Sequence, residues 1–103
     1  LYLKTDRDDV LYTISFLQYE LKNYNESINN LNILLEKNSI DSIKVNVNMN
    51  GNMTQQIAMK SQLHYLKGII YEEKNDKENA KIQFNKAINL SPDFESAIKK
   101  LEK

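Results

Sequence analysis

The stretch SQLHYLKGIIYEEKNDKENAKIQFNKAINLSP, residues 61–92, decides how the rest of the chain is interpreted. Within it, Ala80, Phe84 and Ala87 recur at the i, i+4, i+7 spacing of one helix face. The axes of two packed helices lie about 8–10 Å apart, and Gly68 and Ala80 are small enough to permit that approach. The stretch therefore predicts a helical hairpin whose seam is filled by large side chains such as Phe84.

The ends of these two helices are marked by residues of another kind. Asn75 and Asp76 interrupt the apolar pattern, and both residue types favour turns. Pro92 has no N–H group to donate, so it ends the second helix or opens the next one. Tyr71, just before the turn, is expected to join the seam. An ordinary helical hairpin without repeat ancestry is the alternative to any repeat interpretation.

Six residues of this stretch resemble the signature of the tetratricopeptide repeat, a 34-residue helix–turn–helix unit: Gly68, Tyr71, Ala80, Phe84, Ala87 and Pro92. The resemblance implies an all-α fold of helical hairpin repeats, about five helices in a right-handed superhelical array. Large apolar residues are usual near the start of this repeat, but His64 and Lys67 stand there. We expect Leu63, Leu66 and Ile70 to do that packing instead.

An earlier copy of the pattern lies 53 residues upstream, as the step from Ala80 back to Ser27 shows. Its four marker positions are Ser15, Ser27, Leu31 and Leu34. The first two are small, as Gly68 and Ala80 are, and the last two are apolar, as Phe84 and Ala87 are. The positions of Tyr71 and Pro92 are occupied by Gln18 and Ser39, which departs from the pattern. These four residues and the six above form the expected repeat-packing set.

The whole chain, residues 1–103, is expected to form a single domain. Its expected parts are repeat one at about 8–38, an Asn-rich insertion at about 39–53, repeat two at about 54–92 and a capping helix at about 93–103. Because the sequence begins at Leu1 without a methionine, we expect a fragment of a longer protein.

Helices are expected at about 7–22, 24–37, 55–74, 77–89 and 93–102. The first rests on the helical spacing of Val10, Leu11, Ile14, Leu17 and Leu21. Its predicted cap is Thr5 or Asp6, and that of the third helix is Thr54. The run Ser91-Pro92-Asp93 predicts the start of the last helix.

The Asn-rich insertion shows strand-like alternation between apolar and polar residues. Ile43, Val45, Val47 and Met49 alternate with Lys44, Asn46, Asn48 and Asn50, before an Asn50-Gly51 turn signal. We expect no second strand in the chain, and so we favour a mobile loop. The alternative is an edge at 43–49 that pairs with a partner or with another copy of this chain.

Composition excludes several classes of function. Lys and Arg number 14, as do Asp and Glu, so bulk charge does not favour nucleic acid. The chain has no cysteine and a single histidine, His64, which we interpret as a helix residue with polar surroundings. Glu72 and Glu73 are adjacent, so on a helix they point about 100° apart and cannot act as an acid/base pair.

No glycine-rich phosphate loop and no nucleophile motif occurs in the sequence. We therefore expect no enzymatic activity, no metal and no cofactor. The sequence also has no apolar run of about 20 residues and no signal peptide. We accordingly expect no membrane span and a cytoplasmic location.

The resemblance implies a concave groove lined by the first helices of successive repeats. The positions that match are Tyr12, Phe16, Tyr19, Tyr65, Leu66 and Ile69. Aromatic and aliphatic side chains with an acidic edge suit an apolar peptide or helix with basic residues at one end. Alternatively, neighbouring repeats or the helix expected at 54–60 cover these side chains.

The expected function is a protein–protein interaction module or scaffold. One alternative is an architectural end segment of a longer repeat solenoid. Another is a tetratricopeptide domain of an immunophilin-type co-chaperone, because the long segment before the second repeat resembles the linker of that class. Co-chaperones of this family hold an acidic C-terminal peptide with a two-carboxylate clamp, which is not recognisable here. The matching clamp positions hold Tyr12, Phe16, Tyr65 and Ile69, and none of these carries an ammonium, amide or guanidinium donor.

Overall fold

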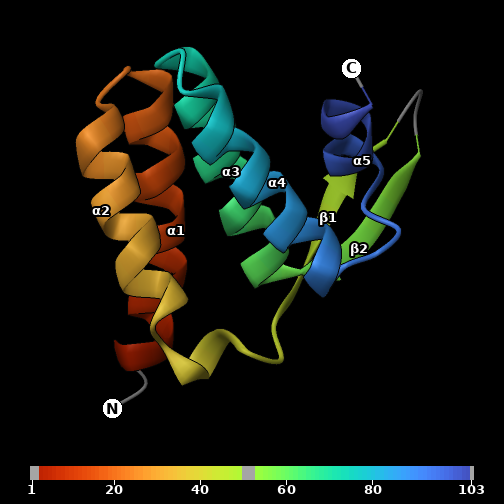
Figure 1. Ribbon diagram of the computed structural model, residues 1–103. Helices are drawn as coiled ribbons and strands as arrows, with labels where there is room; N and C mark the ends of the chain where they lie inside the picture. Colours follow the sequence, from red (N-terminus) through yellow and green to blue (C-terminus); the bar gives the residue numbers. More distant parts are fainter. Residues whose placement is uncertain (1–2, 50–52, 103) are drawn as a thin grey trace. The chain divides into compact units, whose positions relative to one another are not determined.

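The computed structural model describes residues 3–49 and 53–102. The chain separates into two compact units, Leu1–Ile40 and Asp41–Lys103, where the sequence suggested a single domain. Both units are mainly helical (Figure 1). The elements in chain order are α1 (Leu3–Glu20), α2 (Tyr24–Leu35), the 3₁₀-helix η1 (Asn38–Ile40), β1 (Lys44–Asn48), β2 (Thr54–Ala58), α3 (Met59–Glu73), α4 (Lys77–Leu90) and α5 (Glu95–Leu101).

The first unit is a hairpin of α1 and α2 that is held together by small buried residues. Ser15 and Ser27 are both fully buried, and Ser27 Oγ donates a hydrogen bond to the Ser15 carbonyl oxygen at 2.8 Å. A side chain on one helix can reach the backbone of the other only where the two helices pass closely. Leu31 and Leu34 of α2 are also fully buried, so the same face of α2 supplies the apolar core.

The start of α1 differs from the expected one. The helix begins at Leu3 and passes through Thr5 and Asp6, so neither residue is a cap and the predicted start near residue 7 was wrong. Cap preferences are weak where the preceding residues can themselves continue the helix. The helix ends where Lys22 adopts a positive φ of 66°.

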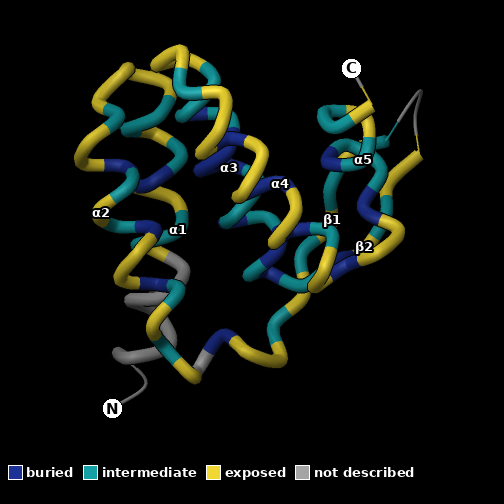
Figure 2. Tube along the Cα trace, viewed as in Figure 1, coloured by how far each residue is buried: buried dark blue, intermediate teal, exposed yellow. Residues whose placement is uncertain are grey.

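The second unit is organised around the α3–α4 hairpin. A Cβ atom placed on Gly68 would lie 2.5 Å from Cε1 of Phe84, so the ring occupies the space that any side chain at 68 would need. Ala80 and Ala87 are buried on the same face of α4. From α3, Leu63, Leu66 and Ile70 are buried, and Tyr71 is half-buried. Figure 2 shows buried segments in both α3 and α4.

The turn between these helices follows the local chemistry expected of Asn and Asp. Asn75 adopts a positive φ of 63°, which asparagine tolerates better than most residues. Asp76 caps α4, because its Oδ1 accepts from the Asn79 backbone N–H at 3.2 Å and its Oδ2 accepts from Asn79 Nδ2 at 2.7 Å. The carboxylate also favours the positive end of the helix.

A two-stranded antiparallel hairpin precedes α3, so the fold is not purely α-helical. β1 pairs with β2 in a register that runs from Lys44↔Ala58 to Asn48↔Thr54. The loop expected at 39–53 is therefore partly a strand, and it has a partner within the chain. The helix predicted from residue 55 was wrong for its first turn, since Thr54 begins a strand. The Asn50-Gly51 turn lies outside the described residues.

Packing and side-chain hydrogen bonds explain why residues 54–58 are extended. Ile57 belongs to a buried cluster with Ala87, Phe94 and Ala97, and the alternating residues Val45 and Val47 pack against it. The Gln55 side chain makes two hydrogen bonds to the backbone at the start of α5. Its Nε2 donates to the Asp93 carbonyl at 2.8 Å, and its Oε1 accepts from the Glu95 N–H at 2.9 Å.

The start of α5 also differs from the expected one. Ser91 follows the end of α4, where its N–H donates to the Ala87 carbonyl at 2.9 Å, and it does not cap the last helix. Its buried hydroxyl lies 2.7 Å from Ser61 Oγ of α3. Pro92 is exposed in the turn that follows, and α5 begins at Glu95 with Phe94 before it. The serine is thus used to join two helices.

Candidate partner-binding surfaces

An aromatic row runs along α1. Tyr12, Phe16 and Tyr19 stand at i, i+4, i+7 and are all half-buried. The rings of Tyr12 and Phe16 meet edge to face with centroids 5.0 Å apart, a favoured aromatic geometry. Tyr19 packs on Tyr24 of α2 at 6.1 Å. Burial raises the pKa of Tyr12 to about 12, so its phenol lies in largely apolar surroundings.

An aliphatic row on α1 is more exposed than the aromatic row. Val10, Ile14, Leu17 and Leu21 are 53%, 37%, 51% and 71% exposed. At about 100° per residue, this row lies roughly opposite the aromatic row around the helix. Sequence reasoning used these residues to place the helix and assigned them no role at the surface. Hydrophobic spacing identifies a face of a helix but does not say what covers it.

The predicted groove residues of α3 have less free surface than those of α1. Leu66 is only 3% exposed. Tyr65 packs within its own unit against Phe84 at 5.7 Å and Phe94 at 5.2 Å, and burial raises its pKa. Ile69 is half-buried. Since the α1 and α3 sets belong to different units, a common groove remains a prediction.

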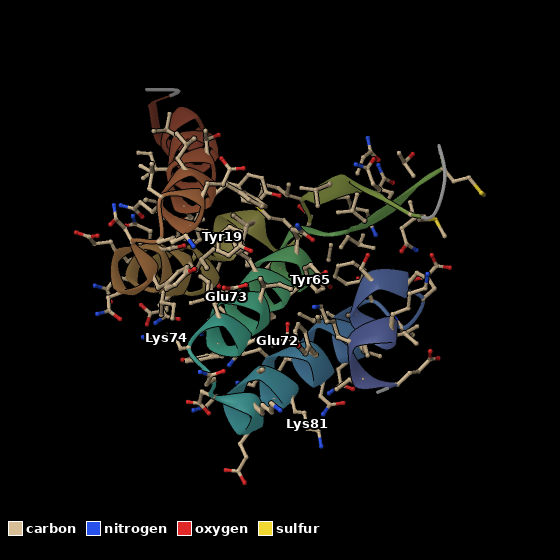
Figure 3. All side chains as sticks on the ribbon, turned by 90° about the horizontal axis from the view of Figure 1, so that it is seen from above. Tyr19, Tyr65, Glu72, Glu73, Lys74 and Lys81 are labelled. Atoms are coloured by element: carbon tan, nitrogen blue, oxygen red, sulfur yellow. The ribbon has the colours of Figure 1, made fainter. Side chains whose placement is uncertain are left out.

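A pocket of about 410 Å³ opens within the second unit between α3, α4 and α5. Ala80, Phe84 and Leu101 give it apolar walls, while Lys77, Lys81, Lys100 and Glu72 bring charges to it. Lys100 Nζ lies 2.9 Å from Glu72 Oε1. Figure 3 labels Glu72 and Lys81, which belong to α3 and α4. Sequence reasoning missed this pocket because its residues come from three helices and only those of α4 show a regular spacing.

The histidine is held inside the α3–α4 hairpin. Its Nδ1–H donates to Gln83 Oε1 at 2.8 Å, as expected for a helix residue in polar surroundings. Burial lowers the pKa of His64. The hydrogen bond to Gln83 raises that pKa in part, and the positive charges of Lys67, Lys86 and Lys60 lower it further. Burial also lowers the pKa of Lys67, and the positive charge of Lys86 lowers it further. These groups are part of the packing of the hairpin.

The described part of the chain holds neither a metal-binding cluster nor a membrane-spanning helix. Among the side chains that the structure describes, His, Cys, Asp and Glu nowhere gather in threes that could hold a metal ion. None of the helices described there combines the length and the apolar character needed to cross a membrane.

Comparison with known proteins identifies one segment of the chain. Residues 61–94 match the family model described as a tetratricopeptide repeat. No curated protein and no solved structure matches the chain. The matched segment contains the Gly68–Phe84 contact and all of α4. The earlier copy at residues 8–38 lies outside it and remains a prediction.

Proposed function

We propose, from the premise that residues 61–94 are a tetratricopeptide repeat, that this chain binds a peptide or helix of a partner protein. The family suggests a protein–protein interaction module in general, and such repeats are generally not catalytic. The proposal adds a specific surface to that general role. It also includes the cytoplasmic location expected from the composition.

The aromatic row on α1 is the observation that supports this surface best. Aromatic side chains supply large contact areas and lose little side-chain entropy on binding, which is why Tyr is frequent among binding hot spots. The edge-to-face contact of Tyr12 with Phe16 and the contact of Tyr19 with Tyr24 hold these rings before any partner arrives. A surface ordered in advance loses less free energy on binding.

The partner's chemistry follows from the groups beside the row. Glu20 is exposed next to Tyr19, and Thr13 is exposed next to Tyr12. An apolar segment that carries a basic residue at one end would therefore meet aromatic rings along its length and a carboxylate at its end. A carboxylate-clamp function is not proposed, because Tyr12, Phe16, Tyr65 and Ile69 give that clamp no cationic or amide donor.

A pull-down from extract of the cells that express the protein tests this proposal. The variant is Phe16→Ala with Tyr19→Ala, which removes two aromatic rings without placing a charge at half-buried positions. We expect the specific partner to be reduced at least tenfold, while circular dichroism shows the helices retained. A matched double variant on the same helix, Leu17→Ala with Leu21→Ala, is expected to retain the partner. Equal retention by both variants would show that the partner uses another surface.

The aliphatic row favours a second candidate, an architectural role in a longer repeat array. Four aliphatic side chains exposed along one face of α1 form the kind of apolar strip that normally packs on another helix. In that case the Leu17→Ala, Leu21→Ala variant is the one that loses its neighbour. The same pull-down therefore separates the two functions by the face of α1 that each requires.

A further inference from the structure

The pocket between α3, α4 and α5 combines apolar walls with an excess of positive charge. Its walls include Phe84 and Ala80, each 2% exposed, and Leu101, which is half-buried. Three lysines and one glutamate line it, and the glutamate is already paired with Lys100. The pocket thus offers both an apolar contact and two positive charges that Glu72 does not balance.

These two charges belong to Lys77 and Lys81, one turn apart on α4. Both side chains are exposed, and among the described residues neither has a carboxylate within ion-pair distance. Four residues of helix separate them by about 6 Å along the axis. A ligand with two or more carboxylates spaced along a chain can therefore pair with both at once.

We propose that this pocket is a second protein-binding site, which takes an acidic segment of a partner by inserting an aliphatic side chain between flanking carboxylates. The aliphatic group would contact Leu101 and the small part of Phe84 that reaches the pocket, and the carboxylates would pair with Lys77 and Lys81. Charge complementarity favours this occupant over a basic or neutral segment. A fatty acid would match the apolar walls, but its single carboxylate would leave one of the two lysines unpaired.

This site goes beyond the proposed function, because it uses α3, α4 and α5 and does not depend on α1. It also calls for the opposite partner chemistry. The α1 surface suits a segment with a basic end, whereas this pocket suits an acidic one. Failure of either proposal leaves the other intact, since their residues lie on different helices.

The test begins with a random 16-residue peptide library displayed on phage and selected on the immobilised protein. We expect enriched peptides to carry Asp or Glu on both sides of Leu, Ile or Met. The enriched peptide is then synthesised with a fluorescent label, and its affinity is measured by anisotropy. In the Lys77→Glu, Lys81→Glu variant the affinity should fall at least tenfold, and Leu101→Ser should weaken it as well.

The matched control is Lys86→Glu with Lys99→Glu. These exposed lysines lie on α4 and α5, outside the pocket, and their replacement changes the net charge equally. We expect this control to alter affinity less than twofold, with thermal melts of both double variants close to that of the unaltered protein. An equal loss in both variants would assign binding to overall charge and overturn the proposal. Enrichment of basic peptides, no enrichment, or displacement of the peptide by dodecanoate would also overturn it.

Discussion

Gly68 and Phe84 show how one pair of residues sets the spacing of a helical hairpin. The ring of Phe84 lies where a side chain of residue 68 would be, so α3 and α4 pass more closely than two larger residues would permit. In an ordinary helix, changing Gly to Ala stabilises by up to about 1 kcal/mol. Whether Gly68→Ala raises or lowers the free energy of unfolding therefore tests the contact between Gly68 and Phe84.

We predict that Gly68→Ala destabilises the protein by about 1–3 kcal/mol, because the added methyl group displaces the Phe84 ring. The free energy of unfolding from urea denaturation checks this. Phe84→Leu should recover part of the loss in the double variant, since Leu leaves room for the methyl group. A stabilising Gly68→Ala would show that the two helices do not meet at this point.

Phe84 itself is 2% exposed, and its ring packs against that of Tyr65 with centroids 5.7 Å apart. We expect Phe84→Ala to lower the free energy of unfolding by about 3–5 kcal/mol, the usual effect of removing a buried aromatic ring. Ile82 of the same helix provides the control, because it is 49% exposed and Ile82→Ala removes far less buried surface. A loss below about 0.5 kcal/mol for Phe84→Ala would mean that the seam is wrongly placed.

His64 predicts how stability depends on pH near neutrality. Its folded-state pKa is lowered by burial, so below the unfolded value of about 6.5 the unfolded chain binds the proton more readily. Stability should therefore fall as pH decreases from about 7 to about 5.5, a range in which carboxylates are still ionised. His64→Gln should flatten that slope in urea denaturation at successive pH values. An unchanged slope would assign the dependence to another group.

At the scale of elements, the β1–β2 hairpin is attached to the second unit through side chains that alternate along the strands. Val45 and Val47 contact the cluster that contains Ile57 and Phe94. We predict that Val45→Asn with Val47→Asn destabilises the unit by about 0.5–3 kcal/mol, measured by thermal and urea denaturation. Asn46→Lys with Asn48→Lys changes only exposed positions of the same strand and should leave stability nearly unchanged.

This packing changes how self-association through residues 43–49 must be tested. Lysine at Val45 or Val47 would disrupt the hairpin itself, so a loss of dimers in such a variant would not identify an interface. Pairing through the free edge of β1 stays a prediction. A cleaner test measures the sedimentation of the Asn46→Lys, Asn48→Lys variant by analytical ultracentrifugation, because these side chains are exposed on the strand.

The elements differ in how far the sequence alone could predict them. The α3–α4 hairpin was predictable because Ala80 and Phe84 lie on one helix face, and because Gly68 and Ala80 are small enough for two helices to pack closely. β1 was recognisable by its alternation, but β2 was not, since Ile57 is the only large apolar residue in its five. Its extended form depends on Gln55 and on contacts with α5, which lie about 40 residues away in the sequence. The pocket depends on such distant contacts as well.

At the scale of the whole molecule, the two units are unequal in their cores. Among the residues whose burial the structure describes (10–38, 40–49 and 53–102), three of the 13 buried hydrophobic residues lie in the first unit: Leu31, Leu34 and Ile40. A smaller core gives a lower local free energy of opening. We predict that amide hydrogens of α1 and α2 exchange faster than those of α3 and α4 in hydrogen–deuterium exchange. Equal protection would show that the units open as one.

This inequality bears on function, because the surface proposed to bind a partner lies on the unit for which we predict the lower free energy of opening. A partner that binds only the folded form stabilises it by mass action. We therefore expect exchange in α1 to slow when the partner is present, with a smaller change in α4. The free protein and the complex can be compared in the same exchange experiment.

The measurement that tests the central claim most directly is photo-crosslinking in the cells that express the protein. A benzophenone amino acid is placed in turn at position 19 of the aromatic row, at position 17 of the aliphatic row and at the exposed position 82 of α4. A partner-binding row on α1 predicts one discrete crosslinked protein from position 19 and none from position 82. Crosslinking from position 82 alone, or from none of the three positions, would contradict an interaction surface on α1.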